Sequence, residues 1–425
     1  MSFPDQENLP SHGNPFTNNV QRHGWWLIAA FVLAMPLGKG FELPLALMAI
    51  SGIVIFIKEG RSVLHNPSLR WLLLLFACIW LPIFFALPDA VKFDRAASTA
   101  LTFLRFPMAG IFAIYALQND TKRQRLFLAI CAILSFWVAD GVLQAVTGHD
   151  IFGFPFIGDR LSGVFYPKLT MGLMLAPLAP IYFEAIRRLS LRWGRGVWLT
   201  FVPYTAVVLL TGSRSAWVMY AAGMVGFAIY LYFITPQRRV GRAILIVLLF
   251  TIPMAALLTQ YVPFQNKLRA TAGLFSGNYE KIDQATSLRL PIWQTALKIS
   301  GDHWLNGIGP RGFRYIYPRY AEPGDPFMAI DPTSGPTHPH QTTLEILVET
   351  GSIGVIGFGI FLTLMLRRVW LATRAGNTYA VPLGLSVLVV TMPINSGLAF
   401  YGSVLSALTW WLIALYCATL QMDHG

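Results

Sequence analysis

Five side chains in this sequence have the chemistry needed to act on a phosphate-bearing substrate: Arg160, Arg214, Arg289, His338 and His340. A guanidinium group donates two parallel, charge-assisted hydrogen bonds to a phosphate, and a neutral imidazole is a suitable general base near pH 7. The alternative for any one arginine is a snorkelling anchor at the membrane surface. Three arginines beside Gly- and Ser-containing turns favour an anion site instead.

Two of the arginines fall where helices are expected to begin. Arg214 follows Ser213 in a turn of about three residues between two apolar segments, and Ser213 is a suitable N-cap. Ser287 is expected to cap an amphipathic helix over 288–300, which places Arg289 in its first turn. The apolar side of that helix is predicted to contain Leu288, Ile292, Trp293, Leu297 and Ile299. Helix starts attract anions, so both positions are suited to binding phosphate.

The histidines lie in Pro336-Thr337-His338-Pro339-His340, directly before another apolar segment. Thr342 and Glu345 form a capping-box pattern, so His340 is expected just ahead of a helix start, whose positive end lowers an imidazole pKa and keeps the ring neutral. The alternative is an exposed loop histidine without a role. Although two histidines can form half of a metal site, no Cys or carboxylate cluster completes one, and no metal is predicted.

The elements that must position these groups are membrane helices. Apolar residues make up 55% of the 425 and charged residues 12%, and the mean hydropathy is +0.54. This composition excludes a soluble globular domain, and the length of the apolar runs favours helices over a β-barrel. We predict an all-α integral membrane protein of about twelve spans, with apolar windows at 24–38, 43–57, 69–87, 99–118, 125–147, 169–186, 196–212, 215–234, 242–261, 341–366, 379–394 and 402–420.

The distribution of Lys and Arg predicts the orientation. With a cytoplasmic N-terminus, short cytoplasmic loops carry sixteen basic residues: Lys58, Arg61, Arg70, Lys122, Arg123, Arg125, Arg187, Arg188, Arg192, Arg195, Arg238, Arg239, Arg242, Arg367, Arg368 and Arg374. The short outward loops carry six: Lys39, Lys92, Arg95, Arg160, Lys168 and Arg214. The positive-inside rule therefore explains the net charge of +12 without a nucleic-acid partner.

This orientation gives a domain plan. It consists of a cytoplasmic tail over 1–23, nine spans over 24–261, a large, partly helical periplasmic loop over 262–340, three spans over 341–420 and a cytoplasmic tail over 421–425. The first apolar run follows a polar stretch without signal-peptide features, so it is expected to remain as an anchor.

Few other polar groups lie within the spans. Cys78, Cys131 and Cys417 fall in apolar runs, where packing roles are expected rather than disulfides or zinc ligation. Arg105 and Asp140 are expected to pair with each other, because an unpaired charge in lipid is costly.

The residues then resemble a known family. His340-Gln341, nine residues and Gly351-Ser352-Ile353-Gly354 fit the H[NSQ]-x9-G-x-x-G pattern of the O-antigen ligases, a branch of the O-antigen ligase/polymerase superfamily. Three further segments are similar to family motifs: Arg160-Leu161-Ser162-Gly163-Val164-Phe165 to R-x-S-G-x-F, Gly212-Ser213-Arg214-Ser215 to the S-R turn, and Arg289 through Trp293 to Gly307-Ile308-Gly309 to the loop motif. The similarity covers roughly residues 20 to 420.

The resemblance implies a metal-independent inverting glycosyltransferase of the GT-C type in the inner membrane of a Gram-negative bacterium. It would move O-antigen polysaccharide from undecaprenyl pyrophosphate to a hydroxyl of lipid A-core at the periplasmic face, without any cofactor. Arg160, Arg214 and Arg289 would hold the pyrophosphate, and His340, aided by His338, would activate the acceptor. The alternatives are an O-antigen polymerase, a protein O-oligosaccharyltransferase and, in a different class, a lipid-linked glycan transporter or flippase.

Overall fold

The computed structural model describes residues 14–234 and 262–420, and within these ranges the secondary structure is helical, without a β-strand. The helices up to the first gap are α1 (Pro15–Leu33), α2 (Glu42–Glu59), α3 (Pro67–Phe85), α4 (Phe93–Phe103), α5 (Arg105–Ala116), α6 (Asp120–Thr147), α7 (Met171–Trp193), α8 (Phe201–Leu210) and α9 (Arg214–Ile234). Beyond it come α11 (Val262–Ala272), α12 (Tyr279–Ala285), α13 (Leu290–Asp302), α14 (Phe313–Tyr320), α15 (Pro326–Ile330), α16 (Thr342–Arg374), α17 (Ala380–Val390) and α18 (Ser403–Thr419).

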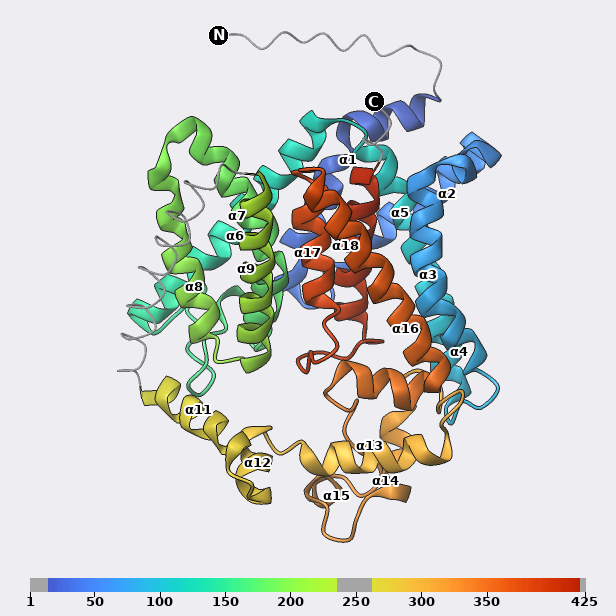
Figure 1. Ribbon diagram of the computed structural model, residues 1–425, viewed down its shortest axis with the longest axis vertical. Coiled ribbons are helices and arrows are strands. Elements are labelled where there is room, and N and C mark those ends of the chain that lie inside the picture. Colours follow the sequence, from blue (N-terminus) through green and yellow to red (C-terminus); the bar gives the residue numbers. More distant parts are fainter. Residues whose placement is uncertain (1–13, 235–261, 421–425) are drawn as a thin grey trace.

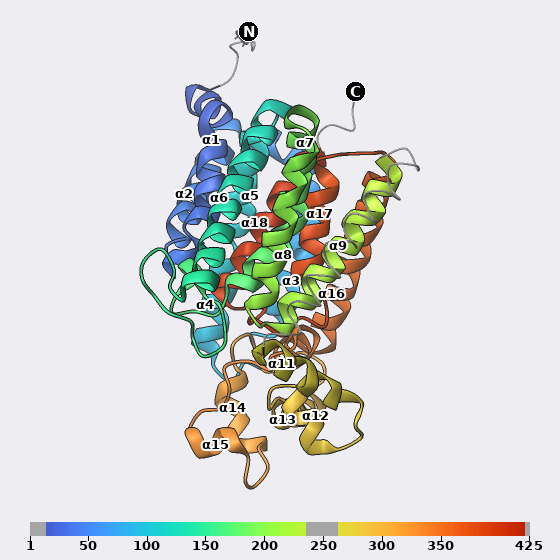
Figure 2. The same ribbon diagram turned by 90° about the vertical axis from the view of Figure 1, so that its left-hand side faces the viewer.

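The long helices form one bundle, and α11 to α15 lie together beyond one end of it (Figures 1 and 2). Helix α5 packs against α1, α2, α3 and α18, while α7 packs against α6, α9 and α17. The beginning of α1 and the end of α18 lie at the end of the bundle opposite α11 to α15 (Figure 1). This arrangement agrees with termini on one side and a large segment on the other.

Six of the described helical stretches are long and apolar enough to cross a membrane: 42–65, 67–85, 93–116, 120–147, 214–234 and 342–374. Three shorter apolar helical stretches cover 195–210, 380–390 and 403–419. All predicted windows fall on helices except 242–261, which lies outside the described residues. An all-helical membrane protein is thus supported, while the number of twelve spans stays a prediction.

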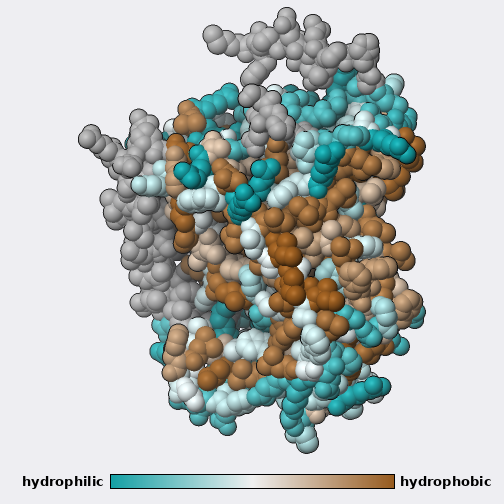
Figure 3. Space-filling view, turned by 45° about the vertical axis from the view of Figure 1, so that its right-hand side comes forward, coloured by the Kyte–Doolittle hydropathy of each residue, from teal (hydrophilic) through white to brown (hydrophobic). Residues whose placement is uncertain are grey.

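The bundle has a broad apolar surface between its two ends. On the face in Figure 3, brown hydrophobic surface fills the middle, between teal hydrophilic surfaces at both ends. Exposed apolar side chains on the lipid-length helices include Ile57, Ile356 and Leu366, which are 72%, 63% and 57% exposed. Such a continuous surface is expected where the surrounding solvent is lipid.

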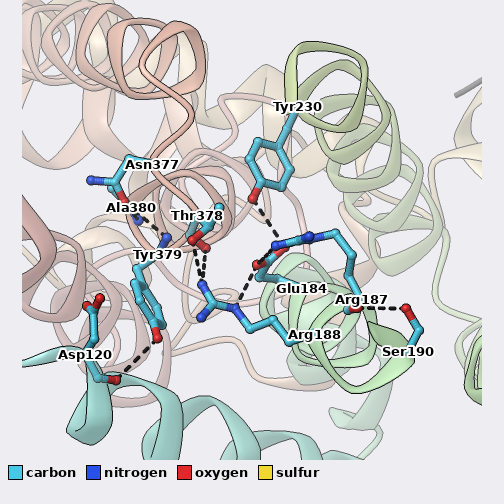
Figure 4. A network of polar contacts seen from close by, with 10 residues as sticks. All are labelled: Asp120, Glu184, Arg187, Arg188, Ser190, Tyr230, Asn377, Thr378, Tyr379 and Ala380. Atoms are coloured by element: carbon cyan, nitrogen blue, oxygen red, sulfur yellow. Dashed lines mark hydrogen bonds and ion pairs between the residues drawn. The ribbon is translucent and has the colours of Figure 1, made fainter. Parts of the chain in front are cut away.

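A polar network ties helices together at the end opposite α11 to α15 (Figure 4). The fully buried carboxylate of Glu184 on α7 accepts from Arg187 at 2.7 Å and Arg188 at 2.8 Å. Tyr230 on α9 donates to the same carboxylate, and Arg188 also donates to Thr378, just before α17. The charge is paired because an isolated carboxylate inside a membrane protein is costly.

The expected Arg105–Asp140 pair is wrong. Arg105 forms an ion pair of 2.5 Å with Glu42 on α2, whereas Asp140 accepts the Ile151 backbone N–H at 2.8 Å and holds the loop after α6. The prediction considered only charged residues inside the apolar windows. It therefore missed Glu42, which lies directly before the window 43–57.

Helix α16 has a sharp kink at Gly351, where φ is +64°. The segment of α16 before the kink consequently lies across the end of the bundle, and α13 and α14 lie below this segment (Figure 1). Backbone hydrogen bonds join the kink to the segment after α13: Ile308 N–H to Val348 O at 3.0 Å, and Ser352 N–H to Trp304 O at 2.8 Å. These bonds replace helical ones that the kink removes.

Glycine is required at the kink because a Cβ at position 351 would lie 2.1 Å from the carbonyl oxygen of Leu305. A Cβ on Gly307, whose φ is +71°, would likewise lie 2.5 Å from the backbone of Glu349. The glycines of the two sequence motifs therefore let two stretches of backbone touch. Their structural role is to fix the α13–α14 unit on α16.

Candidate active site

The two histidines lie on a bent segment directly before α16. Their rings are 3.9 Å apart between centroids, at an angle of 44°. The indole N–H of Trp293 on α13 donates to Pro339 O at 3.0 Å and so fixes the residue between them. His340 has a φ of +54°, which is unfavourable for a residue with a Cβ. Strain of this kind is often found at functional sites.

The capping of α16 differs from the prediction. Gln341 is the N-cap, and its side chain accepts from the Leu344 N–H; the expected capping box of Thr342 and Glu345 does not form. Glu345 instead accepts the backbone N–H of Tyr401 at 3.2 Å. Local spacing could not reveal this, since Tyr401 is 56 residues further along the chain.

Asn395 connects the two motif segments and was not singled out in the sequence. Its backbone carbonyl accepts the Thr342 N–H at 2.9 Å, and its side-chain oxygen accepts from Ser215 at 2.8 Å. The residue is only 3% exposed. Asn395 thus holds the beginning of α16, next to His340, against the beginning of α9, next to Arg214. Two residues earlier, Pro393 O accepts from the Gln341 side chain at 3.0 Å.

Arg214 lies at the first residue of α9, and the expected N-cap is confirmed: the Ala216 N–H donates to Ser213 Oγ at 3.4 Å. Its guanidinium donates to Ala285 O and, at 2.6 Å, to Ser287 Oγ. Arg214 therefore reaches from the bundle to the segment that leads into α13.

Arg160 is positioned by the loop after α6. The fully buried amide of Gln144 accepts from the Ser162 and Gly163 N–H groups at 3.0 and 2.8 Å. Arg160 Nε then donates to Thr211 O at 3.0 Å, in the turn just before Arg214. This brings together two arginines that are 54 positions apart in the sequence.

Arg289 is the N-cap residue of α13, which begins at Leu290. The expected cap, Ser287, has a φ of +63° and bonds Arg214 instead, while Asp283 accepts the Leu290 N–H at 3.0 Å. The predicted helix is confirmed, but its buried face is Ile292, Thr295, Ala296, Ile299 and Ser300, and Leu288 and Leu297 are exposed.

The three guanidinium groups share one electrostatic environment. Burial lowers the pKa of Arg289 most, and the positive charges of Arg214 and Arg160 lower this pKa further. Burial also lowers the pKa of Arg160, yet guanidinium groups stay protonated at neutral pH. Among residues 14–234 and 262–420, no carboxylate forms an ion pair with any of the three. The cluster can therefore stabilise a polyanion.

Both imidazoles are neutral at pH 7. Burial lowers the pKa of His338 to about 3, helped by the charges of His340 and Arg289. Burial, followed by the charge of Arg289, lowers the pKa of His340 to about 4. His338 Nε2 and His340 Nδ1 are buried and make no hydrogen bond within the described chain. The predicted neutral state is confirmed, although the principal cause is burial rather than a helix start.

In the described residues, no group of three or more His, Cys, Asp or Glu side chains is arranged to hold a metal ion. The site thus consists of three cations, two neutral imidazoles and the backbone that positions them.

A family comparison covers most of the residues of this site. Residues 199–359 match the family model described as O-antigen ligase. The match includes Arg214, Arg289, both histidines and the kink glycine, whereas Arg160 precedes it. This part of the chain is therefore similar to O-antigen ligases. No curated protein matches the chain.

Proposed function

We propose that the protein is an O-antigen ligase of the inner membrane. It transfers O-antigen polysaccharide from undecaprenyl pyrophosphate to a hydroxyl of lipid A-core in the periplasmic leaflet. The observation that carries the proposal is that Arg289 shares one electrostatic environment with Arg160 and Arg214 and also acts on two buried, neutral imidazoles at one end of an apolar bundle. The distribution of basic loop residues favours a periplasmic location for this end.

The chemistry is one in-line displacement. The acceptor oxygen bonds to the anomeric carbon, the bond from that carbon to the phosphate oxygen breaks, and the electron pair leaves with undecaprenyl pyrophosphate. The guanidinium groups stabilise the charge of the leaving diphosphate, as preorganised donors do in other enzymes. Because the donor is already activated, neither ATP nor a nucleotide sugar is needed, and the arginines take the place of a divalent cation.

The proton of the acceptor goes to His340. Thr337 Oγ1 lies 3.0 Å from His338 Nδ1, so His338 can donate through Nδ1 and accept through Nε2. A small ring rotation would let His340 Nδ1–H donate to His338 Nε2, the two nitrogens that now lack partners. His340 Nε2 then carries the lone pair of the base, and His338 fixes its tautomer, as the orienting group does in hydrolytic triads.

An O-antigen polymerase is the nearest alternative because it uses the same donor chemistry. Its acceptor is a second lipid-linked chain. A protein O-oligosaccharyltransferase differs only in using Ser or Thr of a protein. Reconstitution in proteoliposomes tests all three, with lipid-linked O-antigen offered together with lipid A-core, a second lipid-linked glycan or a Ser/Thr-rich protein. We expect glycosylated lipid A-core alone, unaffected by EDTA or ATP depletion. Translocation of the donor without any transfer would instead identify a flippase.

The lowered imidazole pKa values predict an unusual pH profile. Protonation inactivates a base, so kcat/KM for the donor, which reports the free enzyme, should stay level from pH 8 to about pH 5 and fall as pH approaches 4. The bound pyrophosphate adds negative charge beside His340 and raises its pKa, so kcat should begin to fall at a higher pH than kcat/KM. A kcat/KM that halves near pH 6.5 would contradict the burial of the base.

A further inference from the structure

A cavity separate from the arginine–histidine site lies at the same end of the molecule and is not explained by the transfer chemistry. Its volume is about 450 Å³. Its buried floor is formed by Thr99, Phe103, Phe106, Tyr401 and Ser406, which are each at most 5% exposed. More exposed polar residues complete the wall: Lys39, Glu42, Arg95, Ser98, Thr102, Arg105, Arg311 and Ser403. The lining combines cations, hydroxyl groups and aromatic rings, the groups that bind charged sugars.

The charge of the lining is positive. Glu42 is the only carboxylate among the lining residues, and it is already paired with Arg105. Lys39, Arg95 and Arg311 stand around the opening, and no ion pair within residues 14–234 and 262–420 involves them. Lys39 and Arg95 are two of the outward-loop cations that break the usual charge trend and that the arginine cluster leaves unexplained.

Exposed apolar side chains occur next to lining residues in the chain. Leu37 and Leu43 lie beside Lys39 and Glu42 in the chain and are 75% and 67% exposed. Leu101 and Leu104 lie beside Thr102 and Arg105 and are 68% and 41% exposed. A polar cavity on elements that also carry exposed leucines matches a lipid with a charged headgroup, because a headgroup can enter the cavity while acyl chains cover apolar surface.

The cavity and the arginine–histidine site share the first segment of α16. His340 precedes that segment directly, while Glu345 accepts the N–H of Tyr401 at 3.2 Å and Glu349 accepts the N–H of Arg311 at 2.7 Å. The helix that positions the proposed base thus also positions two residues of the cavity lining. A molecule bound in the cavity would lie beside residues held by the same helical segment that follows the base.

We propose that this cavity binds the phosphate-bearing sugar headgroup of the acceptor lipid. The inference rests on the proposed function in naming the bound lipid as the acceptor. Binding of that lipid does not itself require the transfer reaction. The arginine–histidine site would then hold the pyrophosphate of the donor, and the two lipids would approach the transfer point from separate openings. Lys39, Arg95 and Arg311 bind the phosphate, and the hydroxyl-lined floor accepts the sugar.

Steady-state kinetics of the double variant Arg95→Gln/Arg311→Gln test the proposal. Each cation should contribute about tenfold, as expected of charge-assisted hydrogen bonds to phosphate. We expect KM for lipid A-core to rise about 100-fold, with KM for the lipid-linked donor within twofold of the parent value. Lys92→Gln is the matched control, because this cation lies at the same end but over the ring of Tyr315, 5.6 Å from its centroid, and not in the cavity lining. A rise in KM for the donor instead, or no change in either, would overturn the assignment.

Direct binding separates this proposal from the proposed function. Fluorescent lipid A-core, its dephosphorylated form and phosphatidylglycerol are offered to the protein in nanodiscs, without donor. We expect binding of the phosphorylated glycolipid, about 100-fold weaker binding in the double variant, and weaker binding of the other two lipids. If the unmodified protein binds in this way but transfers nothing, the ligase proposal fails and the cavity assignment stands. If phosphatidylglycerol binds as tightly as lipid A-core, the cavity is a general anionic-lipid site and not an acceptor site. If the double variant binds lipid A-core as tightly as the unmodified protein, the cavity assignment is refuted.

Discussion

Replacing His340 with Ala should reduce transfer of O-antigen by roughly 10²- to 10⁴-fold, the usual contribution of a general base. The imidazole is buried, neutral and adjacent to the guanidinium cluster, with no group of similar basicity in the described site except His338. His338 is expected to orient the base and not to replace it, since its Nδ1 is already engaged with Thr337. Single-turnover transfer in proteoliposomes measures the loss directly.

Protein abundance and membrane insertion should be unaffected in this variant. Ala at a φ of +54° carries a strain similar to that of His, and the Trp293–Pro339 and Gln341–Leu344 hydrogen bonds that hold the segment involve neighbouring residues. His149→Ala is the matched control, because His149 is exposed in the loop after α6. Polysaccharide-capped lipopolysaccharide at the parent level in the His340 variant would remove this residue from the mechanism.

Local sequence patterns were sufficient to predict the helices but not the contacts between segments that are distant in the sequence. The apolar windows, the Ser213 cap and the helix at 288–300 depend on residues within a few positions of each other. The windows that lie within the described residues fall on helices, the cap is confirmed, and the helix is found as α13 (Leu290–Asp302). The Arg105–Glu42 pair spans 63 positions, and no local spacing encodes it. The kink of α16 at Gly351 likewise goes with backbone contacts to a distant segment, the one after α13.

In the candidate site, too, local sequence points to some residues, whereas others are recognised only from contacts between distant segments. The three arginines and two histidines were selected by local context, namely the Gly- and Ser-containing turns, the expected helix starts and the family motifs around them. The residues that position them were missed: Gln144, Trp293 as a hydrogen-bond donor, and Asn395. Each acts through a backbone group far away in sequence, so only the fold reveals it. An Asn after Ile394, at the end of an apolar window, was the one available signal, since a buried amide needs partners.

Arg214→Lys tests whether geometry matters as well as charge. Lysine keeps the positive charge but cannot form the two parallel bonds of a guanidinium, and it also loses the contacts with Ala285 O and Ser287 Oγ. We expect kcat to fall about 10²-fold, the loss typical of one missing charge-stabilising donor. Arg319→Lys on α14 is the matched control, because that side chain is exposed. Limited proteolysis of the segment 271–289 shows whether the fall reflects loosening of the tether. Intact protection with reduced kcat assigns the loss to the diphosphate, whereas full activity in Arg214→Lys would show that the arginine is an anchor at the membrane surface.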